Sequence, residues 1–150
     1  MEAARWVDRD EYLELPEPSD SASVEIFDPE ISSTSEGEAV KKVSLLEQAA
    51  YNEDKRIRNI RTARGSFRNS ETIIMNSKGV DRQYSSTTCT AQIMAKAENG
   101  QDSQMGWYFM GSRFLNEVSF EDVGKYAARR AVQLLGSKRM YARKTPVILD

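Results

Sequence analysis

Alternation of small apolar and polar residues over residues 88–97 constrains the fold of this chain more than any other feature. Successive side chains of a strand point to opposite faces, so a period of two predicts a β-strand with one face suited to burial. That face consists of Cys89, Ala91, Ile93, Ala95 and Ala97. The opposite face consists of Thr88, Thr90, Gln92, Met94 and Lys96.

A glycine turn before this strand predicts that residues 54–100 form a run of antiparallel strands. The segment Asn76–Gly79 reads NSKG. We expect it to link a strand around Ile73–Met75 to a strand that begins near Val80. Gly79 is expected in the left-handed region, because glycine adopts a positive φ without steric cost.

A second turn, at Asn99–Gly100, predicts a type I′ hairpin, since Asn-Gly favours the positive φ angles of that turn. The return strand then places Met105, Trp107 and Phe109 on one face. We expect the aromatic cluster 107–109 to belong to the core of the sheet. The alternative is that its exposed members contact a peptide or a partner protein.

The first of two expected helices begins at Ser35. Ser35 and Glu38 have the spacing of a capping box, in which each side chain satisfies a free backbone N–H of the first turn. The helix is expected to end near Asn52. Its predicted apolar stripe consists of Ala39, Val43, Leu46 and Ala50.

The second helix is expected to begin at Ser119. Val118 and Val123 have hydrophobic-staple spacing around this cap, and Asp122 occupies the capping-box position. Gly136 is expected just past the helix end, where glycine is favoured. The predicted inward stripe consists of Val123, Ala127, Ala131 and Leu134.

These elements predict an α+β fold, a mostly antiparallel β-meander packed with two main helices. We expect residues 1–23 to be the end of a preceding helix and an acidic Pro/Ser-rich linker. Residues 24–144 would form the central α+β domain, with a short strand at Val24–Phe27 that ends at Asp28–Pro29. Residues 145–150, TPVILD, would be the first strand of a following domain in a longer protein.

Charge is distributed unevenly along the chain. Residues 1–38 carry twelve acidic and two basic residues, whereas residues 39–150 carry nineteen basic and eleven acidic ones. The acidic arm is either a docking segment or a solvated linker. The densest basic run consists of Lys55, Arg56, Arg58, Arg61, Arg64 and Arg68.

This basic run could track nucleic-acid phosphates. It could instead be a solvated strand face opposite the acidic arm or a partner subunit. The chain has a pI of about 5.4 and shows no nucleic-acid reader motif. We therefore do not expect nucleic acid as a partner.

The chain lacks histidine and has one cysteine, which excludes Ser-His and Cys-His nucleophiles within it. Cys89 lies mid-strand on the apolar face, so we expect a structural thiol. The pairs Asp8/Asp10 and Glu121/Asp122 could bind metal or transfer protons. However, one pair lies in the acidic arm and the other at a helix N-terminus, where acids are favoured electrostatically.

We assign no catalytic, cofactor-binding or metal-ligating residue to this chain. It has no secretory signal and no apolar run long enough for a membrane span, so we expect a cytoplasmic location.

The order of several short segments resembles the middle section of the TldD/PmbA family, described as modulators of DNA gyrase and as metallopeptidases. These segments are LLEQAA, DKRIRN, GSF, NSKG, YSST, AENGQ, VGKYAARRA and TPVILD. The resemblance extends from about Trp6 to Asp150. The DKRI and GSF segments resemble the PmbA-type subunit more than the TldD-type one. The absence of a Pro-Ala-Gly segment before TPVILD also resembles the PmbA-type subunit.

The resemblance implies a subunit of a cytoplasmic heterodimeric zinc peptidase. A TldD-type partner, whose HExxxH motif lies beyond the section that this chain resembles, would hold the zinc and hydrolyse peptide bonds. The PmbA-type subunit would complete the chamber that admits peptides and unfolded proteins. No catalytic residue of the family maps onto this chain. The alternative is a non-enzymatic interaction module that regulates a DNA-associated protein such as gyrase.

Overall fold

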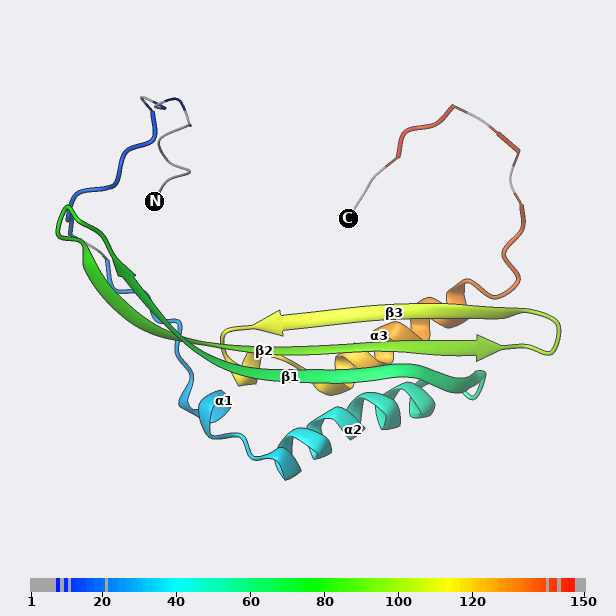
Figure 1. The fold of residues 1–150 in the computed structure, drawn as a ribbon. Helices are drawn as coiled ribbons and strands as arrows, with labels where there is room; N and C mark the ends of the chain where they lie inside the picture. The colour runs from blue at the N-terminus through cyan, green and yellow to red at the C-terminus, as the bar shows by residue number, and fades with distance from the viewer. Residues whose placement is uncertain are drawn as a thin grey trace.

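The computed structural model of the chain is a three-stranded sheet with helices against one face (Figure 1). It describes residues 8, 10, 12–20, 22–139, 141–142 and 144–147. The sheet is antiparallel throughout, in the order β1-β2-β3. The predicted α+β meander with two main helices is confirmed. Its elements are α1 (Pro29–Ser33), α2 (Glu36–Glu53), β1 (Ile57–Met75), β2 (Asp81–Glu98), β3 (Ser103–Ser112), the 3₁₀ helix η2 (Leu115–Glu117) and α3 (Phe120–Gln133).

A capping box starts α2 as predicted. The Ser35 hydroxyl accepts a hydrogen bond from the Glu38 N–H, and the Glu38 carboxylate accepts one from the Ser35 N–H at 2.9 Å. The Ser35 N–H and the Ser35 hydroxyl both donate to the Glu38 carboxylate, and they lower the pKa of Glu38 because they favour its charged form. The helix ends at Glu53, one residue beyond the predicted end. The predicted stripe of Ala39, Val43, Leu46 and Ala50 is buried or half-buried.

Residues 24–27 do not form the predicted strand. They lie beside β2, where the Ile26 carbonyl accepts a hydrogen bond from the Thr87 N–H at 3.0 Å. The chain then enters α1, with Asp28 as the N-cap and Pro29 at the first helical position. Proline fits there because the N–H that it lacks would have no partner inside the helix. Pro29 therefore marks the start of a helix and not the end of a strand.

Asp28 forms a buried polar node that ties α1 to β2 and to η2. Its two carboxylate oxygens accept hydrogen bonds from the N–H groups of Glu30 at 2.8 Å and Leu115 at 2.7 Å. Its own N–H donates to the Thr87 hydroxyl at 2.8 Å, and that hydroxyl donates to the Arg113 carbonyl at 3.0 Å. The node satisfies polar groups that the fold removes from water.

Replacing Asp28 by alanine is expected to lower the free energy of unfolding by about 1.5 kcal/mol, because the change removes an N-cap and leaves the buried Leu115 N–H unpaired. Urea denaturation followed by circular dichroism measures this difference. Glu30→Ala, at an exposed position of the same short helix, is the control and should change stability by less than about 0.5 kcal/mol. Equal stability of the two variants would contradict the role of the node.

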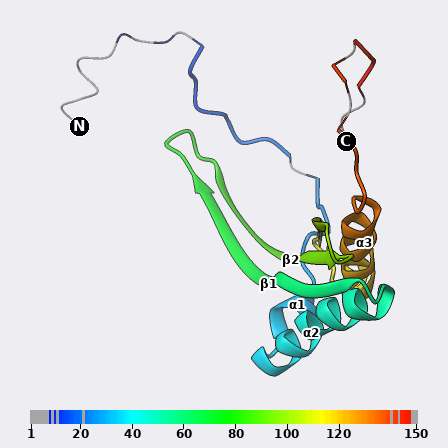
Figure 2. The same cartoon turned by 90° about the vertical axis from the view of Figure 1, so that its right-hand side faces the viewer.

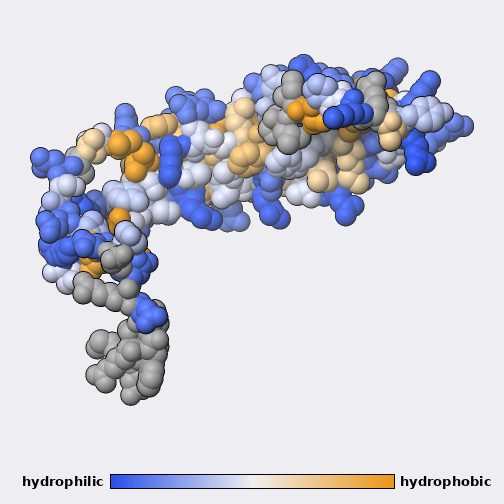
Figure 3. All heavy atoms as spheres, turned by 90° about the horizontal axis from the view of Figure 1, so that it is seen from above, coloured by the Kyte–Doolittle hydropathy of each residue, from blue (hydrophilic) through white to orange (hydrophobic). Residues whose placement is uncertain are grey.

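The β1–β2 hairpin extends beyond the helices as a long arm (Figure 2). β3 pairs with β2 over Cys89–Glu98, whereas β1 and β2 remain paired as far as Met75 and Asp81. Hydrophobic groups lie among hydrophilic ones on this arm (Figure 3). Its exposed large hydrophobic residues are Ile73, Ile74, Met75 and Tyr84.

The turn at the end of the arm has the predicted form. Gly79 has a φ of +90°. The Asn76 side-chain oxygen accepts hydrogen bonds from the N–H groups of Lys78 and Val80, both at 3.0 Å. Asparagine thereby replaces backbone acceptors within the loop, and glycine supplies the left-handed residue.

The type I′ turn predicted at Asn99–Gly100 is wrong. That turn needs positive φ at both central residues, and here Gly100 has a φ of +93° while Gln101, the other central residue, has no positive φ. Asn99 is a corner residue. Its N–H donates to the Asp102 carbonyl at 3.1 Å, and its side-chain oxygen accepts from the Asp102 N–H at 3.0 Å. This side-chain bond takes the place of a backbone bond across the turn.

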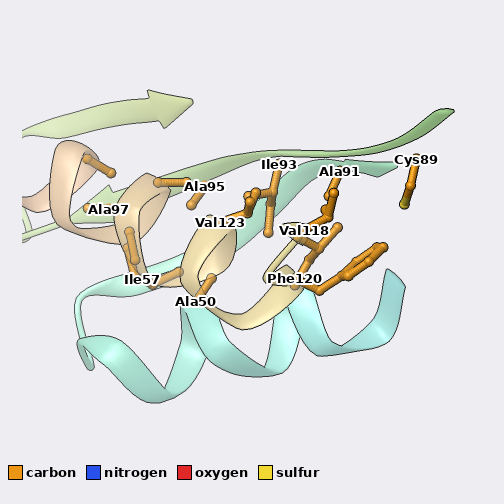
Figure 4. Close-up of a cluster of buried hydrophobic side chains, with 14 of the residues drawn as sticks. Ala50, Ile57, Cys89, Ala91, Ile93, Ala95, Ala97, Val118, Phe120 and Val123 are labelled. Carbon is orange, nitrogen blue, oxygen red and sulfur yellow. The ribbon is translucent and has the colours of Figure 1, made fainter. Parts of the chain in front are cut away.

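Small inner-face residues let the helices approach the sheet closely (Figure 4). A Cβ atom on Gly106 of β3 would lie 2.1 Å from the Ala127 carbonyl oxygen, and one on Gly124 of α3 would lie 2.3 Å from the Leu46 carbonyl oxygen. Backbone therefore packs against backbone at both contacts. The predicted apolar face of β2, which is Cys89, Ala91, Ile93, Ala95 and Ala97, is fully buried in this core.

Helix α3 begins at the predicted cap, Ser119. It ends at Gln133, one residue before Leu134, which is the last residue of the predicted apolar stripe. The Ser119 hydroxyl accepts from the Asp122 N–H at 3.2 Å. Leu134, predicted to face inward, is 46% exposed because the helix ends before it, and Leu135 packs against the core instead. Gly136 has a φ of +76°, as expected for a residue past the helix end. The stripe residues Val123, Ala127 and Ala131 are fully buried.

The structure tests few of the predictions made for the two ends of the chain. The described residues among 1–23 form no helix, and the remaining residues of that segment lie outside the described part of the chain. Residues 145–147 are exposed and form no strand, and residues 148–150 lie outside the described residues. The division of the chain into these three segments stays a prediction. Within the described ranges, no helix is long and apolar enough to cross a membrane.

Candidate functional site

Cys89 is a structural thiol in this fold. Its side chain is fully buried on the inner face of β2. Burial disfavours the charged thiolate and raises the pKa of the Cys89 thiol to about 11. Because the thiolate is the reactive form, Cys89 is not a nucleophile in the folded chain.

Cys89 is expected to react with a disulfide reagent at pH 8 only as fast as the chain unfolds. Its rate should rise to that of a free thiol in urea. The matched control is Gln92→Cys, which places a second thiol on the opposite face of the same strand and should add one fast-reacting equivalent. Fast reaction of Cys89 in the native wild-type chain would contradict the assigned burial.

The two carboxylate pairs singled out in the sequence lie in different environments. Asp8 and Asp10 are exposed residues of the acidic arm. Glu121 and Asp122 lie in the first turn of α3, 4.0 Å and 3.8 Å from the Lys125 ammonium group. In the part of the chain that the structure describes, no group of three or more His, Cys, Asp or Glu residues could hold a metal ion.

The predicted basic run is divided among different environments. Arg56 pairs with Asp54 at 2.7 Å in the connection between α2 and β1. This guanidinium, together with the Arg56 N–H, lowers the pKa of Asp54 to about 2. Arg64 and Arg68 lie further along β1, opposite Gln92 and Thr88, and both are exposed. The run is therefore not one continuous surface.

The acidic arm contacts a different set of cations, at the tip of the hairpin arm. Lys78 lies 4.0 Å from Glu14 and 3.9 Å from Glu17. The Asn76 side chain donates to the Pro16 carbonyl at 2.8 Å. Further along the hairpin arm, the guanidinium of Arg82 donates to the Ser19 carbonyl at 2.8 Å. Residues 14–19 of the acidic arm therefore contact the hairpin tip and not the basic run.

The face of the sheet that points away from the helices is the main exposed surface of the body. Directly opposed residues of antiparallel strands share a face. Met94 lies opposite Trp107, and Gln92 lies between Arg64 and Phe109. We define the outer-face patch by six of these residues, namely Arg64, Gln92, Met94, Met105, Trp107 and Phe109.

Trp107 and Phe109 do not belong to the core as predicted. Each is 47% exposed, and their rings stack with centroids 6.2 Å apart. Between them, Tyr108 points to the inner face and packs against Tyr126 of α3, with the two ring centroids 5.0 Å apart. The predicted alternative, exposed aromatic residues, is therefore the one that the structure shows. The sequence contained a signal for this exposure. When β3 is paired with β2, alternation along β3 places Trp107 and Phe109 on the face opposite the buried face of β2.

A shallow hollow lies within the outer-face patch. Its volume is about 160 Å³, and its lining includes Thr62, Arg64, Gln92, Met94 and Trp107. The hollow is open to solvent and has an arginine and an amide among its lining residues.

The outer face carries mostly positive charge. By strand register its charged residues are Arg64, Arg68, Arg82, Lys96 and Glu98. Lys96 and Glu98 pair with each other at 2.6 Å. Among the described residues, Arg64 and Arg68 have no carboxylate within ion-pair distance. The outer-face patch therefore combines aromatic and methionine side chains with one cation, Arg64, which forms no ion pair with a described residue.

The sequence of this domain matches a known family over most of its length. A family model described as the PmbA/TldA metallopeptidase central domain matches residues 29–135. The chain belongs to the PmbA/TldD family. The resemblance noted from the order of sequence segments is thereby confirmed.

Curated relatives within the PmbA/TldD family carry the PmbA name. The metalloprotease PmbA homologue of Buchnera aphidicola subsp. Acyrthosiphon pisum is 35% identical over 120 residues, which is 75% of this chain and 25% of the relative. Metalloprotease PmbA of Escherichia coli O157:H7 is 30% identical over 132 residues, which is 86% of this chain and 28% of the relative. The chain thus spans about a quarter of the length of these relatives.

Solved structures of the PmbA/TldD family share the fold. A candidate modulator of a DNA gyrase from Thermotoga maritima aligns with a TM-score of 0.76 and 21% identity, covering 85% of this chain and 29% of that protein. TldE from Thermococcus kodakarensis aligns with a TM-score of 0.67 and 20% identity, covering 87% of this chain and 30% of that protein. At these identities the likeness shows the fold alone.

Proposed function

We propose that this chain is the central domain of a PmbA-type subunit in a two-subunit metallopeptidase that degrades or processes peptides and unfolded proteins. The domain serves as a scaffold of the substrate chamber. The observation that carries the proposal is the central-domain match over residues 29–135, together with relatives named metalloprotease PmbA. In this proposal the zinc and the peptide-cleaving water belong to a TldD-type partner, and the complex works in the cytoplasm.

The packing of the domain supports a scaffold role. Helix α3 contacts β3 at backbone level through Gly106, and it contacts α2 at backbone level through Gly124. Such close packing leaves little freedom for the helices to move against the sheet. The single thiol, Cys89, is buried within this packing. The outer face and the hairpin arm both carry exposed large apolar side chains.

Co-expression with the TldD-type protein from the same genome tests this function. The chain, with whatever adjoining sequence its gene encodes, should co-purify with that protein. The complex should cleave an unfolded polypeptide, and a zinc chelator should abolish the cleavage. Each subunit alone is the control. Failure to form a complex, together with no chelator-sensitive cleavage, would overturn the proposal.

A second candidate function is a non-enzymatic module that regulates a DNA-associated protein such as gyrase. Two structural neighbours, from Thermotoga maritima and Bacteroides thetaiotaomicron, are described as candidate modulators of DNA gyrase. Arg64 and Arg68 provide exposed cations on one face. Salt-sensitive DNA binding that is lost when both arginines are changed to glutamate would favour this second function.

A further inference from the structure

Strand β2 has a free edge along the hairpin arm. The stretch Asp81–Thr88 pairs with β1 on one side, and among the described residues no strand pairs with it on the other side. The Thr87 N–H points to that free edge, because it donates to the Ile26 carbonyl and not to β1. The N–H groups of an edge strand point alternately toward and away from its neighbour, so those of Gln83 and Ser85 point to the free edge as well.

A segment of the acidic arm runs alongside this edge of β2 (Figure 1). We define the strap as the described residues of the segment 14–27. Toward the hairpin tip, the Ser19 carbonyl accepts a hydrogen bond from the Arg82 guanidinium at 2.8 Å. Nearer the body, the Ile26 carbonyl accepts one from the Thr87 N–H at 3.0 Å. The strap and β2 therefore run in the same direction, with the strap on the side that β3 leaves free.

The two ends of the strap are held in different ways. At the body end, the strap leads directly into Asp28, which belongs to the buried polar node. At the tip end, the Lys78 ammonium group lies 4.0 Å from the Glu14 carboxylate and 3.9 Å from the Glu17 carboxylate, and all three side chains are exposed. Exposed ion pairs are weak and are screened by salt. The tip end is therefore a releasable latch, whereas the body end is fixed.

Release of this latch would leave the free edge open to the same edge of a second copy of the chain. Two such edges can pair in antiparallel fashion about a two-fold axis at Tyr84. That register places the two Tyr84 side chains, each 44% exposed in the single chain, opposite each other. It places Arg82 opposite Ser86. Aromatic pairs across strands are favourable, and no like charges meet in this register.

We propose that the strap covers the free edge of β2 and keeps the hairpin arms of two copies from pairing along it. The contacts of Lys78 with Glu14 and Glu17 are the latch that holds the strap in place. Proteins commonly cover an exposed strand edge with a loop, because an open edge is a template for pairing with another chain. The acidic arm is thus a docking segment for the hairpin tip of its own chain. This inference does not depend on the proposed function.

Charge reversal with rescue tests the latch. The double variant Glu14→Lys with Glu17→Lys opposes Lys78 with like charges and should release the strap. Adding Lys78→Glu restores the attraction with the signs exchanged and should close the strap again. The matched control is Asp20→Lys with Glu25→Lys. It reverses two exposed strap carboxylates that form no ion pair with a described residue, and it should behave like wild type.

Two measurements on the purified chain follow the strap and the edge separately. Spin labels on Ser19→Cys and Ser77→Cys, both at exposed positions, report the distance between strap and tip by pulsed electron paramagnetic resonance. The native Cys89 is buried and stays unlabelled. Release is expected to broaden this distance distribution. Sedimentation velocity of the unlabelled chains measures dimers, and the double variant is expected to dimerise about tenfold more strongly than wild type.

A further substitution locates the dimer contact. Ser85→Pro removes an N–H group that points to the free edge, where proline is tolerated in a strand. Added to the double variant, it should restore the monomer while the strap stays released. Unfolding temperatures close to that of wild type ensure that each variant is folded.

The outcomes decide each part of the proposal. Release and dimerisation that Lys78→Glu reverses support it. A narrow strap-to-tip distance in the double variant, or equal release in the control, overturns the latch. Release without dimerisation shows that the strap does not keep copies apart and overturns its role as an edge cover. Dimers that persist after Ser85→Pro place the contact elsewhere and overturn the free edge as the pairing site.

Discussion

Replacing Gly106 by alanine is expected to lower the free energy of unfolding by about 3 kcal/mol, which is the upper part of the range for overpacking a core. The new Cβ would lie 2.1 Å from the Ala127 carbonyl oxygen and 2.3 Å from the Ala131 nitrogen. Both atoms are backbone atoms of α3, so no rotamer change relieves the clash. The whole helix must move away from β3, which opens the core around it.

Urea denaturation of the purified chain measures this change, and the same strand offers the control. Gly111 lies on the outer face, opposite Thr90. A Cβ on Gly111 would meet the ends of the Phe109 and Thr90 side chains at 3.1 Å and 3.2 Å. Because side chains can yield, Gly111→Ala should cost less than about 1 kcal/mol. Similar losses for Gly106→Ala and Gly111→Ala would show that α3 does not press on β3 as described.

Replacing Gly124 by alanine sets two opposing effects against each other. Alanine is a better helix former than glycine by about 1 kcal/mol, which favours the variant. However, the new Cβ would lie 2.3 Å from the Leu46 carbonyl oxygen and 3.0 Å from the Ala49 Cβ. This clash forces α2 and α3 apart and costs about 3 kcal/mol. We expect a net loss of about 2 kcal/mol in the free energy of unfolding.

Gly37→Ala is the matched control for this helix prediction. Gly37 lies in the first turn of α2, and a Cβ there would meet no atom within 4 Å. The variant should gain up to about 1 kcal/mol from helix propensity alone. If Gly124→Ala is also stabilised in the same denaturation series, the close approach of the two helices is wrong.

Local features of the fold could be predicted because their causes lie within a few residues. The Ser35 and Ser119 caps depend on a side chain and an N–H group three residues away. The left-handed glycines at Gly79 and Gly136 follow from steric freedom that glycine alone has. Gly100 has the positive φ that the type I′ prediction required, but that turn is not formed, because the Asn99 side chain bonds to the Asp102 N–H and Asn99 has no positive φ.

The candidate site could be predicted only in part. Alternation along β3 correctly placed Met105, Trp107 and Phe109 on one face. Large aromatic side chains suggested that this face was buried, because such residues contribute most to cores. The structure instead buries the alanine-rich face and leaves the aromatic one exposed. Asp28 was also missed, since its partners Thr87 and Leu115 lie 59 and 87 residues further along the chain.

The sequence by itself determined which residues share a face, where the two main helices start and to which family the chain belongs. Periodicity and capping are local, and the family pattern is carried by the order of short segments. Which face of β3 the helices cover was decided by tertiary structure. Gly106 and the small residues of β2 allow α3 to approach at backbone distance, whereas the rings of Trp107 and Phe109 would hold a helix away. Close packing therefore selects the face with the smaller side chains, and the aromatic face is left exposed.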